Sequence, residues 1–485
     1  MDTALEPPGP IVSQSASALA RAIQSGELTA SEVLEAHLKR IDQVNPKVNA
    51  VIARDDALAR ERAAQADRAL ARGESWGPLH GVPFTIKDVF ATRAMVTTYG
   101  MPHLTHHRPK QNAAVVDRLQ AAGAILMGKT NLPFASYDWQ SRHPRLGRCN
   151  NPHDLARTPG GSSGGTAAAL AAHLTPVDVG SDLAGSIRVP CHFCGVWGLR
   201  PTEGFIPDAG HGSVPNMRGQ IHHMVTVGPM ARTSEDMQLG MQVLAGLEPR
   251  NAAPLPPEGL NIAWSGHFGG VVPVSSVQAV IGAYRQSLVK CNARLTHAAP
   301  EVNPQELVAL WGHINGHEMG QILPRAATLP VLGRAVGLGY FRGRLGPGNM
   351  PLALRQGFTA SQRDFERWLA QREELGAHVD RFFEQFDAWI LPVAPFPAFQ
   401  HQRTGAPISV ANHRFAYADA LATYNCSLSV LGQPVVAMPI GTTPQGLPVS
   451  VQVVGPRGSD ARLVRIARGL AGALQNARGD RAPLN

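Results

Sequence analysis

The sequence has few cysteines, no long apolar run and no dense cluster of basic residues. Its five cysteines are too few for a disulfide framework in so long a chain, which favours a reducing compartment. No stretch of about eighteen consecutive apolar residues occurs, so we expect no membrane-spanning helix. The N-terminal segment has acidic residues and no apolar centre, unlike a secretory signal. We therefore expect a cytoplasmic protein.

The motifs that usually carry metal ligands are also missing. Cys191 and Cys194 form a C-x-x-C pair, but no second pair follows at zinc-ribbon spacing. Buried apolar thiols are therefore favoured over redox or metal chemistry. The nineteen histidines include no H-E-x-x-H motif. The sequence indicates no metal ion and no organic cofactor.

The chain is basic, with a formal net charge of +8, but its lysines and arginines are scattered. The densest basic patch, at residues 106–110, is short, so we expect no nucleic-acid partner. Hydrophobic residues make up 44% of the 485 residues and charged residues 16%. This composition provides enough apolar material for a large folded core.

Short apolar segments alternate with helical patterns, which predicts an α/β fold. A helical segment at 14–45 carries a capping box of Thr29 and Glu32. Further helices are predicted at 113–122, 165–174 and 460–475, and strands at 81–90, 124–128, 175–182, 383–395, 434–440 and 446–456. We divide the chain into an N-terminal helical segment packed on the core (1–75), a core (76–245), a variable, loop-rich region that shapes the pocket (246–380) and the C-terminal part of the core (381–485).

Two adjacent serines, Ser162 and Ser163, lie in the stretch "TPGGSSGGTAAAL", and each fits the pattern G-x-S-x-G. A nucleophile elbow needs a buried strand directly before the serine. The preceding "RCNNPHDLARTP" is polar and contains two prolines, so it is a poor central strand. No lysine precedes Thr166, which excludes a phosphate-binding P-loop.

Ser186 has the context that the paired serines lack, because the apolar strand in "VDVGSDLAGSIRVP" leads directly into its loop. Small residues there, Ala184 and Gly185, would let backbone N–H groups approach a substrate oxygen. The block from Pro159 to Gly204, together with "GVPFTIKD" and "GLPVSVQVVGP", strongly resembles the amidase signature family. The resemblance implies a single amidase-signature fold: a large mixed, mostly parallel, twisted β-sheet flanked by α-helices on both faces.

The resemblance also implies a Ser–cis-Ser–Lys triad, with Ser186 as nucleophile, Ser162 as the bridging serine in a cis peptide and Lys87 as base. The oxyanion hole would be formed by the backbone amides of Leu183, Ala184, Gly185 and Ser186. Ser163 would support the loop by hydrogen bonds, and Asp182 and Arg188 would tie down the nucleophile loop by an ion pair.

The apolar neighbours of Lys87 suit a role as base. A free lysine has a pKa of about 10.4, and lowering it to about 7 costs roughly 4–5 kcal/mol. Burial can supply that shift. Phe84, Ile86, Val89 and Phe90 surround Lys87 in the sequence, so we expect a buried amine.

The sequence departs from the common family pattern at Ala184, where glycine is usual, at Phe134, where many members carry glutamate, and at His143, where asparagine is more usual. Ser136, Tyr137 and Trp139 are candidates for the substrate pocket. Tyr137 and Trp139 are equally compatible with lining the acyl side of the pocket and with packing in the core.

We expect a hydrolase that cleaves a C–N acyl bond through an acyl-enzyme, with an amide, an aryl amide, a carbamate (urethane) or also an ester as substrate. The region 246–380 and the loop 205–223 are expected to decide the substrate. The alternative is the amidase subunit of a glutamine-dependent tRNA amidotransferase-like complex. A non-catalytic binding protein is hard to reconcile with Lys87, Ser162 and Ser186 together. The expected partner is a small-molecule amide or carbamate substrate, and the chain is expected to be a monomer or a homodimer.

Overall fold

The computed structural model of the chain describes residues 5–215, 221–322, 345–346 and 348–478. The α-helices are α1 (Ala16–Gln24), α2 (Ala30–Val48), α3 (Asp56–Ala71), α4 (Ala114–Ala121), α5 (Gly164–Ala171), α6 (Arg188–Cys194), α7 (Ser234–Ala245), α8 (Ser275–Lys290), α9 (Pro304–Ile322), α11 (Asn349–Phe358), α12 (Gln362–Phe382), α13 (Tyr417–Leu431) and α14 (Asp460–Arg478). The strands are β1 (Val51–Arg54), β2 (Pro83–Lys87), β3 (Ile125–Thr130), β4 (Arg142–His143), β5 (Gly147–Arg148), β6 (Val177–Asp182), β7 (Trp197–Arg200), β8 (Thr226–Ala231), β9 (Asn261–Trp264), β10 (Arg294–His297), β11 (Ala388–Pro392), β12 (Ile408–Val410), β13 (His413–Phe415), β14 (Val435–Thr442) and β15 (Pro448–Val454).

The predicted α/β fold with a large mixed sheet is confirmed, but the sheet is not mostly parallel. Its eight strands are ordered β10-β9-β11-β15-β14-β7-β8-β6. Of the seven neighbouring pairs that these described strands form, only β10–β9 and β9–β11 run parallel. The other five pairs are antiparallel, and among them only β14 and β15 are joined by a short turn, whereas the rest pair strands that are distant in the chain.

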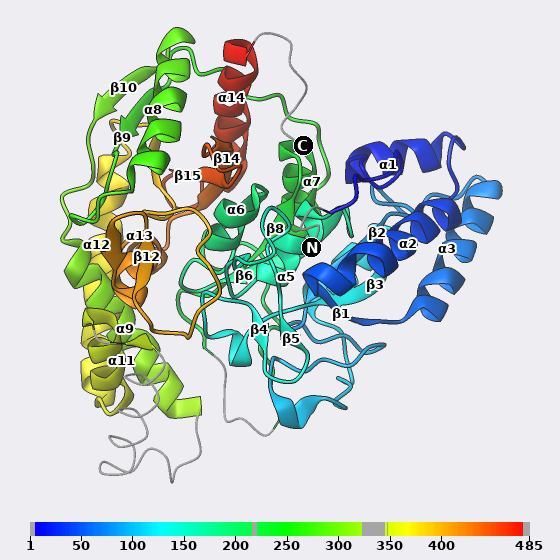
Figure 1. The fold of residues 1–485 in the computed structure, drawn as a ribbon, viewed down its shortest axis with the longest axis horizontal. Helices are drawn as coiled ribbons and strands as arrows, with labels where there is room; N and C mark the ends of the chain where they lie inside the picture. Colours follow the sequence, from blue (N-terminus) through cyan, green and yellow to red (C-terminus); the bar gives the residue numbers. More distant parts are fainter. Residues whose placement is uncertain (1–4, 216–220, 323–344, 347, 479–485) are drawn as a thin grey trace.

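Helices cover both faces of this sheet, and neighbouring residues of β8 show which helix lies on which side. Pro229 faces Gly240 of α7, whereas Gly228 and Met230 face the side of Ile187, directly before α6. Side chains alternate between faces along a strand. Helix α7 therefore lies on one face and α6 on the other. Figure 1 shows α1–α3 at one end of the molecule, beside β1–β3, and α9 and α11–α13 at the other end.

A second, smaller sheet carries the predicted base. Strands β1, β3 and β2 form it in that order, with β1 antiparallel and β2 parallel to β3. Its β2 lies beside the edge strand β6 of the large sheet. A buried hydrogen bond of 2.6 Å from Thr85 Oγ1 to Asp178 Oδ2 joins the two strands. The end of β2 is thereby fixed next to the end of β6.

The N-terminal helices pack on this small sheet through their apolar faces. The predicted capping box is confirmed, since Glu32 N donates to Thr29 Oγ1 and Thr29 N to Glu32 Oε2. Helix α2 continues past the expected end and contains Pro46. The start of α1 is bound to the core by Asp236 of α7, whose carboxylate accepts from Ala16 N at 2.7 Å and Ser17 N at 2.9 Å.

The region 246–380, which was expected to be loop-rich, holds four helices among its described residues, α8, α9, α11 and α12. Three glycines of α9 allow two of these helices to pack closely. Gly312, Gly316 and Gly320 recur every fourth residue on α9 and face α11 so closely that a Cβ atom would meet α11 atoms at 2.2–2.7 Å. Here glycine allows two helix backbones to approach closely instead of breaking the helix. Residues 323–344 of this region, and 216–220 of the loop 205–223, lie outside the described residues.

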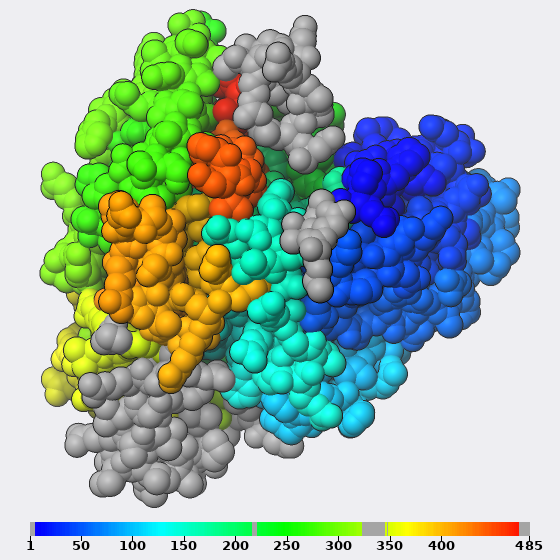
Figure 2. All heavy atoms as spheres, viewed as in Figure 1, coloured from blue at the N-terminus to red at the C-terminus, as the bar shows by residue number. Residues whose placement is uncertain are grey.

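Segments distant in sequence cover one side of the molecule together. In Figure 2 the orange residues near 400 lie against the cyan residues near 150. Thr158 N donates to Phe399 O at 3.0 Å, and Arg157 and Gln400 form an isolated β-bridge. No helix among the described residues has the length and apolar character that crossing a bilayer requires.

The attachment of α1 to Asp236 is testable. Replacing Asp236 by Ala removes a buried carboxylate that accepts two backbone hydrogen bonds, each worth about 1.5–3 kcal/mol when the acceptor is charged. We expect the α1 amides to exchange with deuterium at least about tenfold faster, since about 1.4 kcal/mol corresponds to a factor of ten. Exposed Glu27→Ala is the control and leaves exchange in α1 as in the wild type. Unchanged α1 exchange in the Asp236 variant would contradict this attachment.

Candidate active site

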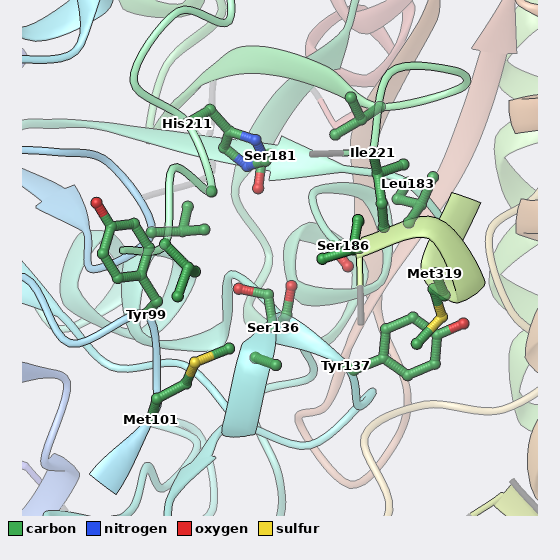
Figure 3. A pocket seen from close by; sticks show the side chains of 17 residues that line it. Tyr99, Met101, Ser136, Tyr137, Ser181, Leu183, Ser186, His211, Ile221 and Met319 are labelled. Carbon is green, nitrogen blue, oxygen red and sulfur yellow. The ribbon is translucent and has the colours of Figure 1, made fainter. Parts of the chain in front are cut away.

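Three separate elements bring the predicted catalytic residues together. Lys87 is the last residue of β2, Ser162 lies two residues before α5, and Ser186 lies in the loop between β6 and α6. Ser162 and Ser186 line one cavity, whose surroundings Figure 3 shows. The placement of β2 beside β6 therefore carries the lysine to the serines.

Lys87 is fully buried, and its Nζ lies 2.7 Å from Ser162 Oγ. Burial lowers its pKa to about 7, although the charges of Asp182 and Asp178 act in the opposite direction. Among the described residues, no carboxylate lies within ion-pair distance of its amine. A large fraction of Lys87 is therefore neutral near pH 7 and can accept a proton.

Ser181, on β6, also contacts the lysine and was not identified from the sequence. Its Oγ lies 3.0 Å from Lys87 Nζ, and it lines the same cavity as Ser186. With Ser162, it fixes the direction of the amine. The only sequence signal was its place at the end of the predicted strand 175–182, directly before Asp182.

The loop after β6 presents backbone amides toward Ser186, with one departure from the predicted set. Gly185 N donates to Asp182 Oδ1 at 2.8 Å, so this amide is already engaged. The hydrogen bonds found among the described residues do not use the amides of Leu183, Ala184 or Ser186. These three are available to a substrate oxygen.

Two tryptophans fix the peptide planes of this loop. Trp311 Nε1, from α9, donates to Leu183 O at 2.9 Å, and Trp139 Nε1 donates to Ala184 O at 2.8 Å. A trans peptide directs its N–H opposite to its C=O, so the bond to Leu183 O turns Ala184 N–H away from Trp311. Trp139 is buried and also packs beside Tyr417. Trp311 was missed because it comes from the region 246–380.

Asp182 and Arg188 hold the base of the loop, in the positions expected for a supporting pair. Arg188 Nη2 lies 2.8 Å from Asp182 Oδ1, and Arg188 Nε lies 3.0 Å from Oδ2. Burial alone would raise the pKa of Asp182, but the Arg188 and Arg200 guanidinium groups lower it below its usual range. Since both partners are fully buried, losing either one would leave an uncompensated charge.

The glycine–serine stretch, residues 160–165, contributes Ser162 to the wall of the cavity. The peptide bond between Gly161 and Ser162 is cis. Ser163 N donates to Ser186 O at 3.1 Å, and Ser163 Oγ donates to Ser181 O at 3.3 Å. Ser163 thus links the glycine–serine stretch to β6 and to the nucleophile loop. A Cβ atom at Gly165 would lie 2.2 Å from Asn131 N, which explains the glycine there by close packing.

Two cavities meet at Ser186. The larger has a volume of about 180 Å³ and the smaller about 40 Å³, and Ser136, Tyr137 and Leu183 line both. The remaining walls of the larger cavity are mostly apolar: Val89, Tyr99, Met101, Ala135, Val214, Ile221, Val225, Met319 and Ile322. Trp139 and Trp311 line the smaller one. Within the described parts of the chain, no group of three or more His, Cys, Asp or Glu side chains is arranged to hold a metal ion.

The burial of Lys87 has a testable effect on stability. The pKa of Lys87 is about 7 in the folded protein, against 10.5 normally. Between pH 7 and pH 10.5 the amine therefore loses its proton when the chain folds. The free-energy cost of burying the amine is largest at and below pH 7. One pKa unit corresponds to about 1.36 kcal/mol, and the variant also loses the hydrogen bonds of the amine. We therefore expect Lys87→Met to raise the free energy of unfolding by about 2 kcal/mol at pH 7 and by less than about 1 kcal/mol at pH 9.5.

Lys129→Met is the matched control for this denaturant-unfolding experiment. Lys129 is equally buried on the neighbouring strand, but it lies 3.5 Å from Asp88 Oδ1. Its removal leaves a buried carboxylate unpaired and should destabilise the protein. If both variants unfolded more easily than the wild type at pH 7, burial of the Lys87 amine would not cost the folded protein free energy, and this prediction would be wrong.

Comparisons with known proteins agree with this geometry. The profile of the family described as Amidase matches residues 32–464. An acylamidase of Rhodococcus erythropolis is 32% identical over 93% of this chain and 94% of its own length. One subunit of the glutamyl-tRNA(Gln) amidotransferase of Methylococcus capsulatus is also 32% identical, over 93% of this chain and 94% of its own.

The structure of a bacterial aryl acylamidase, described as an amidase signature enzyme, shows the same fold. It superimposes with a TM-score of 0.80 at 23% identity, covering 96% of this chain and 97% of that one. The family profile spans most of the chain, and the two relatives extend over nearly all of it. The chain therefore belongs to the amidase signature family of hydrolases.

Proposed function

We propose that this protein is an amidase that cleaves a C–N acyl bond through an acyl-enzyme on Ser186, with Ser162 as proton relay and Lys87 as base. The observation that carries the proposal is the buried amine of Lys87, 2.7 Å from Ser162 Oγ, at the cavity that also contains Ser186. A serine hydroxyl becomes a useful nucleophile when a neighbouring base removes its proton.

In the proposed mechanism, Ser186 gives its proton to Ser162 as Ser162 passes its own proton to Lys87. The Ser186 oxygen attacks the carbonyl carbon, and the negative charge develops on the carbonyl oxygen. The free amides of Leu183, Ala184 and Ser186 stabilise this charge. When the C–N bond breaks, the proton returns from Lys87 through Ser162 to the leaving nitrogen. Water then repeats the sequence on the acyl-enzyme and releases the acid.

The walls of the cavity favour an apolar substrate. Among the described residues that line the larger cavity there is no aspartate, glutamate, lysine or arginine. A free amino acid such as glutamine would bury two unpaired charges there, which is costly. This observation supports a free-standing amidase, in line with the acylamidase relative, over the glutamine-dependent amidotransferase alternative. The proposed substrates are amides and aryl amides of apolar acids, and carbamates with apolar substituents.

The expectations of a cytoplasmic location, of a monomer or homodimer, and of catalysis without metal or cofactor stay predictions. An assay of the purified chain without partner proteins, ATP or added metal addresses the last of these. A panel of an anilide, the phenyl ester of the same acid and a carbamate of aniline with an alkoxy group of similar size would rank the bond types. Activity that required glutamine and partner proteins would favour the amidotransferase alternative.

Replacing Ser186 by Ala tests the assignment of the nucleophile. Loss of the attacking oxygen should lower kcat by about 10⁴-fold or more, and no acyl-enzyme should be detected by mass spectrometry after rapid quenching. Ser163→Ala is the matched control, because Ser163 supports the loop but does not attack, and it should keep measurable turnover. If the Ser163 variant were inactive and the Ser186 variant active, the assignment would be wrong.

The pH profile tests the assignment of the base. Because the pKa of Lys87 is lowered to about 7 and only the neutral amine accepts a proton, kcat/KM should rise as pH increases through about 7 and then level off. Stopped assays on an apolar anilide, at constant ionic strength, measure this. A profile that is flat from pH 5 to 9, with chemistry rate-limiting, would count against Lys87 as base.

A further inference from the structure

Two polar atoms in the larger cavity have no hydrogen-bond partner among the residues that the structure describes. Ser136 Oγ and His211 Nε2 are buried, and neither makes a hydrogen bond within the described residues. Both residues line the cavity together with Ser186. Figure 3 shows the three side chains around the same hollow. An unpaired buried polar atom costs about 1–3 kcal/mol, so these two atoms call for a partner that the described residues do not supply.

The backbone around Ser136 is held in an unusual conformation. Ala135 and Ser136 have φ angles of 51° and 59°, in the left-handed region that side chains other than glycine seldom adopt. The turn is closed by Ser136 N donating to Pro133 O at 3.0 Å, and the adjacent Tyr137 hydroxyl donates to Asn315 Oδ1 at 2.8 Å. Ser136 is thus fixed in the wall that both cavities share.

His211 is presented from the other side, by the loop 205–223. Its backbone N–H donates to Asp208 O at 2.8 Å, and its backbone forms an isolated bridge with Phe90. The imidazole lies over the Phe90 ring with centroids 5.2 Å apart. Burial, and then the charge of Lys87, lower the pKa of His211 to about 3. The ring is therefore neutral and offers one donor and one acceptor nitrogen.

We propose that the substrate carries a second polar group, an amide or a hydroxyl, that hydrogen-bonds to His211 and Ser136 while its scissile C–N bond lies at Ser186. The inference rests on the proposed amidase function and narrows its substrate class. The remaining walls of the cavity away from the catalytic serines are mostly apolar, so these two atoms mark where a polar group of the substrate is favoured. A simple alkyl or aryl amide would leave both atoms unpaired.

Matched substrate pairs test this proposal. On the acyl side, the p-nitroanilide of N-acetylglycine is compared with that of pentanoic acid, which has the same chain length without the inner amide. On the amine side, the acetamide of 4-hydroxybenzylamine is compared with that of benzylamine. The measured quantity is the ratio of kcat/KM for the polar and the apolar member. In the wild type, this ratio should exceed one in at least one pair.

His211→Phe keeps an aromatic ring over Phe90, and Ser136→Ala removes only the hydroxyl. In each variant, the polar-to-apolar ratio of the preferred pair should fall by about three- to tenfold, the effect of one hydrogen bond. His211→Gln, which retains hydrogen-bonding atoms, should recover part of the ratio. Val214→Ala, elsewhere in the same cavity, is the control and should alter both members of each pair alike.

The outcomes separate this inference from the proposed function. If the wild-type protein hydrolyses none of the four compounds, or if Ser186→Ala hydrolyses them equally well, the amidase proposal fails. If the wild type hydrolyses them but the ratios are the same in wild type, His211→Phe and Ser136→Ala, the amidase proposal stands and this inference is overturned. Circular dichroism and thermal unfolding confirm that each variant is folded before its ratio is used.

Discussion

The burial of the Lys87 amine is the constraint on which the rest of the site depends. In water the amine would be protonated at neutral pH. Its position among apolar side chains, without a carboxylate in contact, lowers its pKa to about 7. A neutral amine beside Ser162 Oγ can begin proton transfer. In the proposed mechanism, the serines and the loop amides depend on this lysine being buried and held in one direction by Ser162 and Ser181.

The contacts that hold Lys87 in place span two separate sheets, which share no hydrogen-bonded pair of strands. Lys87 ends β2 of the small sheet, whereas Ser181 and the Ser186 loop belong to β6 of the large one. The bond from Thr85 to Asp178 and the bonds of Lys87 to Ser162 and Ser181 cross this junction. The contacts that pack the two sheets together are therefore also the contacts that position Lys87.

Several expectations failed for reasons that lie in tertiary contacts. The helix–strand order suggested a mostly parallel sheet, but five of the seven neighbouring pairs among the described strands are antiparallel, and four of these five join strands that are distant in the chain. The region 246–380 was expected to be loop-rich, yet its described residues hold four helices, and the glycines of α9 allow close packing against α11. Gly185 N was expected in the oxyanion hole but donates to Asp182. In each case the local pattern was compatible with two structures, and contacts with distant segments selected one.

The sequence by itself determined the family, the α/β class and the candidates Lys87, Ser162 and Ser186, because each lies in a short motif whose residues are neighbours in the chain. The tertiary structure alone decided which other side chains reach them. Ser181, Trp311, Ser136 and His211 lie in four separate segments, and no local spacing links them. Packing brings them to two cavities that meet at Ser186, because burial of the surrounding elements joins these segments, lowers the pKa of Lys87 and leaves Ser136 Oγ and His211 Nε2 without partners among the described residues.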